Sequence, residues 1–352
     1  EGDPSVGDDP CRAGAVRERR DPRCGFAEQG KGVHSVSGAS PEMALGEGRA
    51  LICLGGNLAV AAPDPDGTFR ALRGLDLTVH IATKLNRTHL AHGKASFILP
   101  CLGRSEIDRQ ASGPQRVTVE DSMCTVRSSG GVREPASSEL RSECAIVAGL
   151  AKAALADGGG IDWDALVANY DRIRDAIAAV LPELFRDFNA RLRQHGDFYL
   201  ANPARERKWL TASGKAEFLT VDGLAEDHYR AQTDVLTLTT VRSHEQFNTT
   251  IYSDDDRYRG VFGRRDVLFM APADLHARGL APGQRVTVSS AVDPARQREL
   301  TVVVRELPTG SAAMYYPESN TLISLDRFDG PSKVPAFKSV PVRVTAALQG
   351  DG

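Results

Sequence analysis

The chain has 352 residues, of which 41% are hydrophobic and 25% are charged, and its formal net charge is −3. This length is enough for about two domains. The near-neutral charge, with no long basic run, argues against nucleic-acid binding, and no run of about 18 apolar residues predicts a membrane span. The first residues lack the apolar core of a signal peptide. The six cysteines have no C-x-x-C spacing, so we expect a cytoplasmic chain without a zinc or iron–sulfur site of its own.

Residues 1–48 differ in composition from the rest of the chain. They are rich in Gly, Pro, Arg, Asp and Ser and contain almost no periodic hydrophobic residues. Such a segment cannot bury much apolar surface, so we expect it to be largely disordered.

Strands and helices alternate from Ala50 onward. The apolar run 50–54 predicts a buried strand that ends in a glycine pair, a helix is predicted over 68–75, and two further strands over 77–83 and 93–100. This order predicts a parallel, doubly wound α/β sheet, which binds ligands at the carboxyl ends of its strands. The polar residues at these strand ends are Asn57, Thr83, Lys84, Asn86, Thr88 and His89. Turn and capping chemistry would account for the same residues.

The middle of the chain carries one pair of carboxylates and then becomes helical. Glu106 and Asp108 are interpreted either as a general acid–base pair or as surface or capping carboxylates. A capped helix is predicted from Ser137 to Leu155, and the glycine-rich segment 157–160 breaks it. Two more helices, separated near Pro182, are predicted over 162–192, and residues 220–232 are interpreted as a linker.

The C-terminal third contains short strands, one short helix and frequent turns. Strands are predicted over 236–241, 266–270, 286–288, 300–304, 311–316 and 340–344, with a helix near 274–279. This pattern predicts a closed β barrel. After the first barrel strand, hydrogen-bonding side chains crowd into nine positions: Arg242, Ser243, His244, Gln246, Asn248, Thr249 and Thr250. They are typical of a loop that binds a large polar ligand, and a solvated loop is the alternative.

Several segments together resemble one enzyme family. The barrel segments TLTTVRSHEQFNTTIY, YYPESN and VPAFKSVPVRV, and the upstream segments LICLGGNLAVAAPD, TKLNRTHL and LRSECAIVAGLA, occur in the order seen in the molybdopterin-guanine-dinucleotide oxidoreductases of the dimethyl-sulfoxide-reductase superfamily. The closest group is the formate-dehydrogenase-like alpha subunits. The resemblance implies a partial doubly wound α/β domain with a helical extension at 49–225 and a double-psi β barrel at 233–350. It also implies a polar strand at 207–219, and it does not include residues 1–48, which we interpret as foreign to the family.

The resemblance implies a cofactor and a set of residues that bind it. The cofactor is molybdenum bis(molybdopterin guanine dinucleotide), whose phosphates need cations and backbone N–H groups and whose guanines need polar side chains. The candidate cofactor-binding residues are Gly55, Gly56, Asn57, Thr83, Asn86, Arg242, Ser243, His244, Asn248, Thr249, Thr250, Asn320 and Lys338. No catalytic residue and no metal ligand is assigned.

The function implied is that of the C-terminal, cofactor-binding portion of a molybdenum oxidoreductase. The N-terminal domains of the family, which have no counterpart in this sequence, are expected to supply a 4Fe–4S cluster and the residue nearest the metal, and an electron-transfer partner is expected beside them. Two alternatives remain open: a non-catalytic double-psi-barrel binding module, which predicts an apolar or acidic groove, and an inactive gene remnant. The substrate and the choice between molybdenum and tungsten are not predicted.

Overall fold

The protein is described here by a computed structural model that covers residues 48–218, 220, 229, 231–328 and 334–347. Nearly all of the predicted disordered segment 1–48 and most of the predicted linker 220–232 lie outside these residues. Of the described residues, those between 100 and 220 form one compact unit, unit 1, and residues 48–99 join residues 229–347 in unit 2. No helix of the described part is long and apolar enough to cross a membrane.

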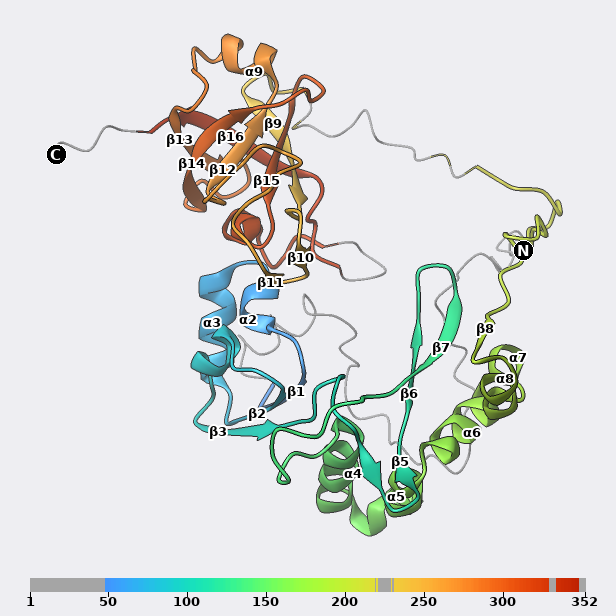
Figure 1. The fold of residues 1–352 in the computed structure, drawn as a ribbon. Coiled ribbons are helices and arrows are strands. Elements are labelled where there is room, and N and C mark those ends of the chain that lie inside the picture. The colour runs from blue at the N-terminus through green and yellow to red at the C-terminus, as the bar shows by residue number, and fades with distance from the viewer. Residues whose placement is uncertain (1–47, 219, 221–228, 230, 329–333, 348–352) are drawn as a thin grey trace, which may run out of the picture. The chain divides into compact units, whose positions relative to one another are not determined.

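The N-terminal part of unit 2 is a small three-stranded sheet in the order β1-β2-β3, whose first two strands are parallel and joined by one crossover helix (Figure 1). Its elements are β1 (Ala50–Leu54), α2 (Leu58–Ala61), α3 (Pro65–Gly74), β2 (Leu77–Ala82), the 3-10 helix η1 (Arg87–Leu90) and β3 (Ala95–Pro100). β1 and β2 are parallel and in register from Ala50 opposite Leu77 to Leu54 opposite Ile81. Leu72 and Leu75, both fully buried, pack α3 against the sheet with Leu51. The predicted strand–helix–strand unit is confirmed, but the strand 50–54 is not buried as predicted, since Ile52 and Leu54 are 57% and 54% exposed. The extension to a larger doubly wound sheet stays a prediction.

The C-terminal part of unit 2 is a closed six-stranded barrel, which confirms the predicted barrel (Figure 1, yellow to red). Its strands are β9 (Val235–Val241), β12 (Val267–Met270), β13 (Arg285–Ser290), β14 (Gln297–Val304), β15 (Ser311–Tyr315) and β16 (Val340–Ala346). Around the barrel they follow the order β12-β14-β13-β16-β9-β15. The other elements are β10 (Gln246–Phe247), β11 (Thr250–Ile251), α9 (Pro272–Ala277) and the 3-10 helix η4 (Glu318–Leu322).

The barrel consists of two interlocked halves with the same pairing pattern. If β9 is exchanged with β14, β12 with β15 and β13 with β16, the strand order around the barrel is the same, read in the opposite direction. The exchange also converts the parallel pair β9–β15 into the parallel pair β14–β12, and the antiparallel pair β13–β14 into the antiparallel pair β16–β9. This internal symmetry supports the predicted double-psi description of the barrel.

Alternating apolar residues fill the interior of the barrel. Leu236 and Leu238 of β9, Leu268 and Met270 of β12, and Leu300 of β14 are all fully buried in one cluster. Each leucine of this kind contributes roughly 1.5–3 kcal/mol through burial. The barrel is therefore a rigid base for the loops that leave its strand ends.

Hydrogen bonds join the small sheet to the barrel within unit 2. The buried Asn320 amide nitrogen donates to the carbonyl oxygens of Val60, Ala61 and Ala62, at 2.8, 3.2 and 3.0 Å. These are carbonyls at the C-terminal end of α2, which have no partner inside so short a helix. The Asp64 carboxylate also pairs with Arg296 of the barrel. The structure thus groups residues 48–99 with the barrel, whereas the sequence predicted a division after residue 225.

Unit 1 consists of small antiparallel sheets and a series of short helices. Its strands are β4 (Arg109–Gln110), β5 (Gly113–Pro114), β6 (Val117–Glu120), β7 (Thr125–Ser129) and β8 (Asp197–Tyr199). Its helices are α4 (Glu143–Ala154), the 3-10 helix η2 (Ala156–Gly160), α5 (Trp163–Ala168), α6 (Tyr170–Val180), α7 (Pro182–Phe185) and α8 (Phe188–His195). Val126, Phe188 and Phe198 form its buried apolar cluster.

Three predictions for unit 1 are corrected by the structure. Helix α4 begins at Glu143 rather than at Ser137, because Ser142 accepts the capping hydrogen bond from the Ala145 N–H. Four helices replace the two predicted after the glycine-rich break, since Asn169 is extended between α5 and α6. The polar strand predicted at 207–219 is not formed by its described residues, where side chains bond locally instead, as Thr211 does to the Lys215 carbonyl.

Candidate functional site

The glycine loop after β1 and the loop after β2 meet at the carboxyl edge of the parallel pair. Gly55 and Gly56 have φ values of 68° and 75°, a left-handed conformation that favours glycine. The Asn86 amide nitrogen donates to the Gly56 carbonyl at 2.8 Å, and the Thr88 hydroxyl donates to the Asn57 amide oxygen at 2.9 Å. The structure therefore brings together these predicted residues of the two strand ends.

Asn86 also organises its own loop. Its side-chain oxygen accepts from the Thr88 N–H at 3.0 Å, and its N–H donates to His89 Nδ1 at 3.0 Å, so Asn86 caps η1 from both directions. Thr83 is exposed beside this cap. No atom lies within 4 Å of the position that a Cβ on Gly56 would take. The backbone of the glycine loop is thus open to close approach by a ligand.

The polar loop after β9 is held from inside by Arg265. The Arg265 side chain is 8% exposed and donates to Ser243 Oγ at 2.6 Å and to Gln246 Oε1 at 3.0 Å. The Ser243 N–H also donates to Gln246 Oε1, at 2.9 Å, and the Gln246 amide nitrogen donates to the Asn248 carbonyl. Asn248 has a φ of 51°, so the loop reverses at this residue. Buried hydrogen bonds therefore fix the path of the backbone.

The outer side of this loop presents positive charge. Arg242 donates to the Asn248 side-chain oxygen, and a guanidinium nitrogen of Arg257 lies 3.0 Å from His244 Nε2. The His244 ring lies edge-on to Tyr258, with 4.3 Å between centroids. In the described part of the chain, Arg242 and Arg257 have no carboxylate within salt-bridge distance. Two guanidinium groups thus remain without a neutralising partner at the surface of the loop.

The neighbouring arginine is neutralised. Asp256 is 1% exposed and accepts from Arg259 at 2.6 Å and from the Tyr315 hydroxyl at 2.8 Å. Burial raises the pKa of the Asp256 carboxyl, but these hydrogen bonds and the charge of Arg259 outweigh that effect and hold the pKa below its usual range. Asp256 and Arg259 therefore support the loop, and Arg242 and Arg257 are the cations that it exposes.

The remaining predicted residues divide into exposed and internal groups. Thr249 and Thr250 belong to the same polar loop, and Thr250 lies in the two-residue strand β11. Lys338 is exposed, and its ammonium group donates to the carbonyl of Thr240 at the end of β9. Asn320 is 1% exposed, its amide nitrogen donates to protein carbonyls, and its side-chain oxygen has no hydrogen-bond partner among the described residues, so its contact with the cofactor stays a prediction. Ser243 is likewise 7% exposed and bonded within the protein.

Sequence reasoning missed Arg265, Gln246 and Arg257 as members of the site. Gln246 was noted in the polar loop but not chosen as a contact, and the pair Arg264-Arg265 gave no sign of which arginine is buried. The hydrophobic run that begins at Val267 placed both arginines just before a buried strand, but it did not distinguish one from the other. Its partner Glu318 is far along the sequence, so the pairing itself could not be predicted.

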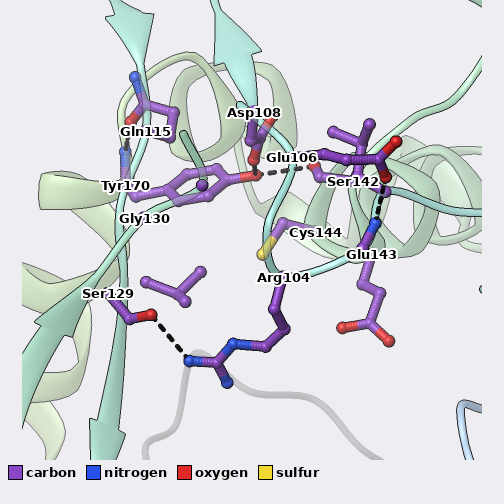
Figure 2. A pocket seen from close by; sticks show the side chains of 14 residues that line it. Arg104, Glu106, Asp108, Gln115, Ser129, Gly130, Ser142, Glu143, Cys144 and Tyr170 are labelled. Atoms are coloured by element: carbon purple, nitrogen blue, oxygen red, sulfur yellow. Dashed lines mark hydrogen bonds between the residues drawn. The ribbon is translucent and has the colours of Figure 1, made fainter. Parts of the chain in front are cut away.

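Unit 1 contains a separate pocket with a volume of about 100 Å³ (Figure 2). In it the buried Tyr170 hydroxyl lies between Asp108 Oδ2 at 2.5 Å and Ser142 Oγ at 2.8 Å. Burial and the hydrogen bond to Asp108 raise the pKa of Tyr170, so its hydroxyl stays protonated. The Cys144 thiol and the Arg104 side chain also line the pocket, and Arg104 donates to Ser129 Oγ at 2.9 Å.

The two carboxylates of this pocket have structural partners. Glu106 accepts from the N–H groups of Gly103 at 2.6 Å and Ala136 at 2.7 Å, and these bonds lower its pKa. Asp108 accepts from Tyr170 and from the Gln110 amide at 2.6 Å. Of the two interpretations made from the sequence, the structure supports capping carboxylates rather than a general acid–base pair. No group of three or more His, Cys, Asp or Glu within the described ranges could hold a metal ion.

Comparison with known proteins identifies the family. Residues 236–341, the barrel with its polar loop, match the family described as the molydopterin dinucleotide binding domain. The chain is 46% identical to protein YdeP of Escherichia coli K12 over 349 residues, which is 98% of this chain and 46% of that protein. It is 41% identical to the uncharacterized oxidoreductase Rv2900c of Mycobacterium tuberculosis over 322 residues, 89% of this chain and 41% of that protein. The chain belongs to the molybdopterin oxidoreductases, as their C-terminal part.

A solved structure agrees at the level of the fold. Acetylene hydratase from Pelobacter acetylenicus superposes with a TM-score of 0.57 at 13% identity, over 89% of this chain and 46% of that one. This molybdopterin oxidoreductase chain thus spans about half the length of the curated relatives that it matches. Because the alignment with YdeP includes 98% of the chain, it extends into residues 1–48. That coverage argues against the interpretation of this segment as foreign to the family.

Proposed function

We propose that this chain forms part of the binding site for molybdenum bis(molybdopterin guanine dinucleotide) in an oxidoreductase that resembles formate-dehydrogenase alpha subunits. The observation that carries the proposal is the polar loop 242–250 inside the matched dinucleotide-binding domain, where Arg242 and the adjoining Arg257, which contacts His244, have no carboxylate partner among the described residues. Guanidinium groups of this kind bind pyrophosphate oxygens through charged, often paired hydrogen bonds.

The residues present fit the cofactor in chemical type. Around the loop, Arg242, Arg257 and Lys338 offer cationic donors, and Asn248 and Thr250 offer neutral hydrogen-bonding groups to a guanine edge. At the strand edge, the open backbone of the glycine loop is the kind of surface that a dinucleotide approaches closely. Both segments belong to unit 2. The proposed contacts are Gly55, Gly56, Asn57, Thr83, Asn86, Arg242, His244, Asn248, Thr249, Thr250, Arg257 and Lys338, with Ser243 and Asn320 as internal supports.

The proposed task of this chain is to bind and orient the cofactor. When bound, the molybdenum centre supplies the redox chemistry, and the protein supplies position and electrostatic environment. The iron–sulfur cluster, the residue nearest the metal and the electron-transfer partner are expected from parts of the longer relatives that have no counterpart here. The resemblance to formate dehydrogenases leaves the substrate open, and we place the enzyme in the cytoplasm.

A non-catalytic binding module is the alternative, and the loop argues against it. That alternative predicts an apolar or acidic groove; the loop exposes Glu245 and Phe247, but it also carries Arg242, His244 and amide and hydroxyl groups, with Arg257 beside it, and the two arginines favour an anionic ligand. The two functions are therefore separable by an arginine substitution combined with a cofactor assay.

The experiment compares the cofactor content of variants purified from cells that make the cofactor. Pterin and molybdenum are measured in the wild-type chain, in Arg242→Ala and Lys338→Ala, and in Arg127→Ala as a control. Arg127 is 57% exposed in unit 1, with loose ion pairs at 3.6 and 3.7 Å. A charged hydrogen bond contributes about 1.5–3 kcal/mol, so the affinity of Arg242→Ala for the cofactor should fall by roughly ten- to a hundredfold. The affinity of the Arg127→Ala control should not change. A folded wild-type chain without pterin, or equal loss in the control, contradicts the proposal.

A further inference from the structure

Arg265 connects the polar loop to the turn that follows β15. Its Nε donates to Glu318 Oε1 at 2.6 Å, and its Nη2 donates to Glu318 Oε2 at 3.0 Å, so the two side chains form a double hydrogen bond. Nη2 also donates to the Tyr316 carbonyl at 2.9 Å, while Nη1 reaches Ser243. Because the guanidinium group is planar and rigid, these bonds fix the loop and the turn relative to each other.

The same turn fixes the other predicted contact segment. Residues 318–322 form η4, and Asn320 of η4 holds the carbonyls of Val60, Ala61 and Ala62, directly after the glycine loop. In return, the Asp64 N–H donates to the Asn320 carbonyl at 3.0 Å. A continuous set of hydrogen bonds thus runs from Ser243 through Arg265, Glu318 and η4 to the loop after β1.

Arg265 and Asn320 are both buried. Their exposed fractions are 8% and 1%, and Arg265 additionally packs on the Tyr315 ring, with 4.8 Å from its guanidinium carbon to the ring centroid. The ion pair with Glu318 is largely desolvated, since the Glu318 side chain is only 17% exposed. Removing one member of such a pair leaves a buried charge without a partner, which is costly.

We infer that Arg265 is the positioning residue of the dinucleotide site: with Glu318 and Asn320 it holds the loop 242–250 and the loop after β1 in their binding arrangement. This inference rests on the proposed function for the identity of the ligand. The arrangement of the two loops does not depend on that ligand. Loss of Arg265 releases the loop 242–250, and loss of Asn320 releases the segment 57–64, while the barrel keeps its core.

The test measures amide hydrogen exchange and binding of guanosine diphosphate, which carries the guanine and pyrophosphate of the cofactor. The variants are Arg265→Met and Asn320→Ala, with Arg264→Met as the matched control. Arg264 is the adjacent arginine, is 42% exposed and pairs with Asp266 rather than with the loop. In Arg265→Met we expect amides of 243–250 to exchange about tenfold faster, a change of about 1.4 kcal/mol, and diphosphate affinity to fall by a similar factor. In Arg265→Met, the amides of β13 and β14 should exchange at the wild-type rate. The Arg264→Met variant should show neither faster exchange nor weaker diphosphate binding.

The outcomes separate a positioning role from a general loss of stability. If β13 and β14 exchange faster to the same extent as the loop, Arg265 is only a stabilising residue and the inference is wrong. If Arg265→Met does not fold, Glu318→Gln, which keeps the shape but removes the charge, must loosen the loop selectively, or the inference fails. Asn320→Ala must accelerate exchange in 57–64 and leave 243–250 protected. Should the wild-type chain bind no guanosine diphosphate while these exchange patterns hold, the proposed ligand is wrong and the positioning role stands.

Discussion

The ion pair between Asp64 and Arg296 joins the small sheet to the barrel, and its removal should destabilise unit 2 selectively. Two contacts of 2.9 Å join Arg296 Nη1 to Asp64 Oδ1 and Nη2 to Oδ2, and the two side chains are 20% and 12% exposed. The Asp64 carboxylate also caps α3 by accepting from the Gly67 N–H at 3.1 Å. Losing the cap costs about 1 kcal/mol, and breaking a buried pair costs about 3–5 kcal/mol.

For Asp64→Ala we expect a loss of about 3 kcal/mol, which is less than the summed range of about 4–6 kcal/mol because the pair is partly exposed. Arg296 keeps a second partner, because its Nε lies 3.1 Å from Asp293 Oδ2. Asp64→Asn retains a capping oxygen and removes only the charge, so its loss should be smaller by about 1 kcal/mol. The free energy of opening is measured by hydrogen exchange of peptides from α3. Both tryptophans, Trp163 and Trp209, belong to unit 1, so their fluorescence during urea unfolding is an internal control that should not change.

The contribution of Asp64 should depend on pH. Burial raises the pKa of its carboxyl, but the hydrogen bonds from Arg296 and Gly67 and the charge of Arg296 outweigh burial and lower the pKa in the folded state. Because the pKa is lower in the folded chain, the ionised carboxylate stabilises the fold at any pH above its pKa in the unfolded chain, about 3.9. This stabilisation is lost as the pH falls through the pKa of the folded chain. The difference between wild type and Asp64→Asn should therefore shrink below about pH 4. A difference below about 1 kcal/mol at neutral pH, or one that grows in acid, would refute this reasoning.

Three further predictions concern other parts of the chain. Leu268→Ala, in the barrel interior, should lower the free energy of unfolding of unit 2 by about 2–5 kcal/mol in chemical denaturation followed by circular dichroism. Gly56→Ala should destabilise the fold by about 1–2 kcal/mol because Gly56 has a positive φ. Gly149→Ala should stabilise it by about 0.5–1 kcal/mol, because Gly149 lies inside α4 and no atom is near the position of its Cβ. Thermal melts of the two variants measure both effects. Tyr170→Phe should destabilise unit 1 by about 1–3 kcal/mol, read by tryptophan fluorescence, because Asp108 loses its buried donor.

Local patterns predicted most of the elements that this structure contains. The alternation of Leu236 and Leu238 in β9 and of Val286 and Val288 in β13 identified barrel strands, because a strand with one buried face repeats every second residue. The glycine pair at the end of β1 likewise marked a strand end open to a ligand. The strand pattern depends on residues close together in sequence, and it is confirmed; the ligand expected at the glycine pair stays a prediction.

The errors came where long-range contacts decide the outcome. The contact between the Asn320 amide nitrogen and three distant carbonyls near the end of α2 could not be predicted from the residues around Asn320. Arg265 is buried because Glu318 neutralises it, and nothing near Arg265 in the sequence distinguishes it from the exposed Arg264. The grouping of the small sheet with the barrel has the same origin, since it depends on pairs such as Asp64 and Arg296.

The central claim is that two segments of unit 2 bind the pterin dinucleotide, and a comparison of hydrogen exchange in the cofactor-loaded and cofactor-free chain tests it most directly. The account predicts protection of residues 55–57 and 83–89 together with residues 242–250, and no change in the unit 1 pocket around Tyr170. Two results would contradict the claim. One is protection only around the Tyr170 pocket, and the other is a chain that retains pterin but shows no protection in either segment of unit 2.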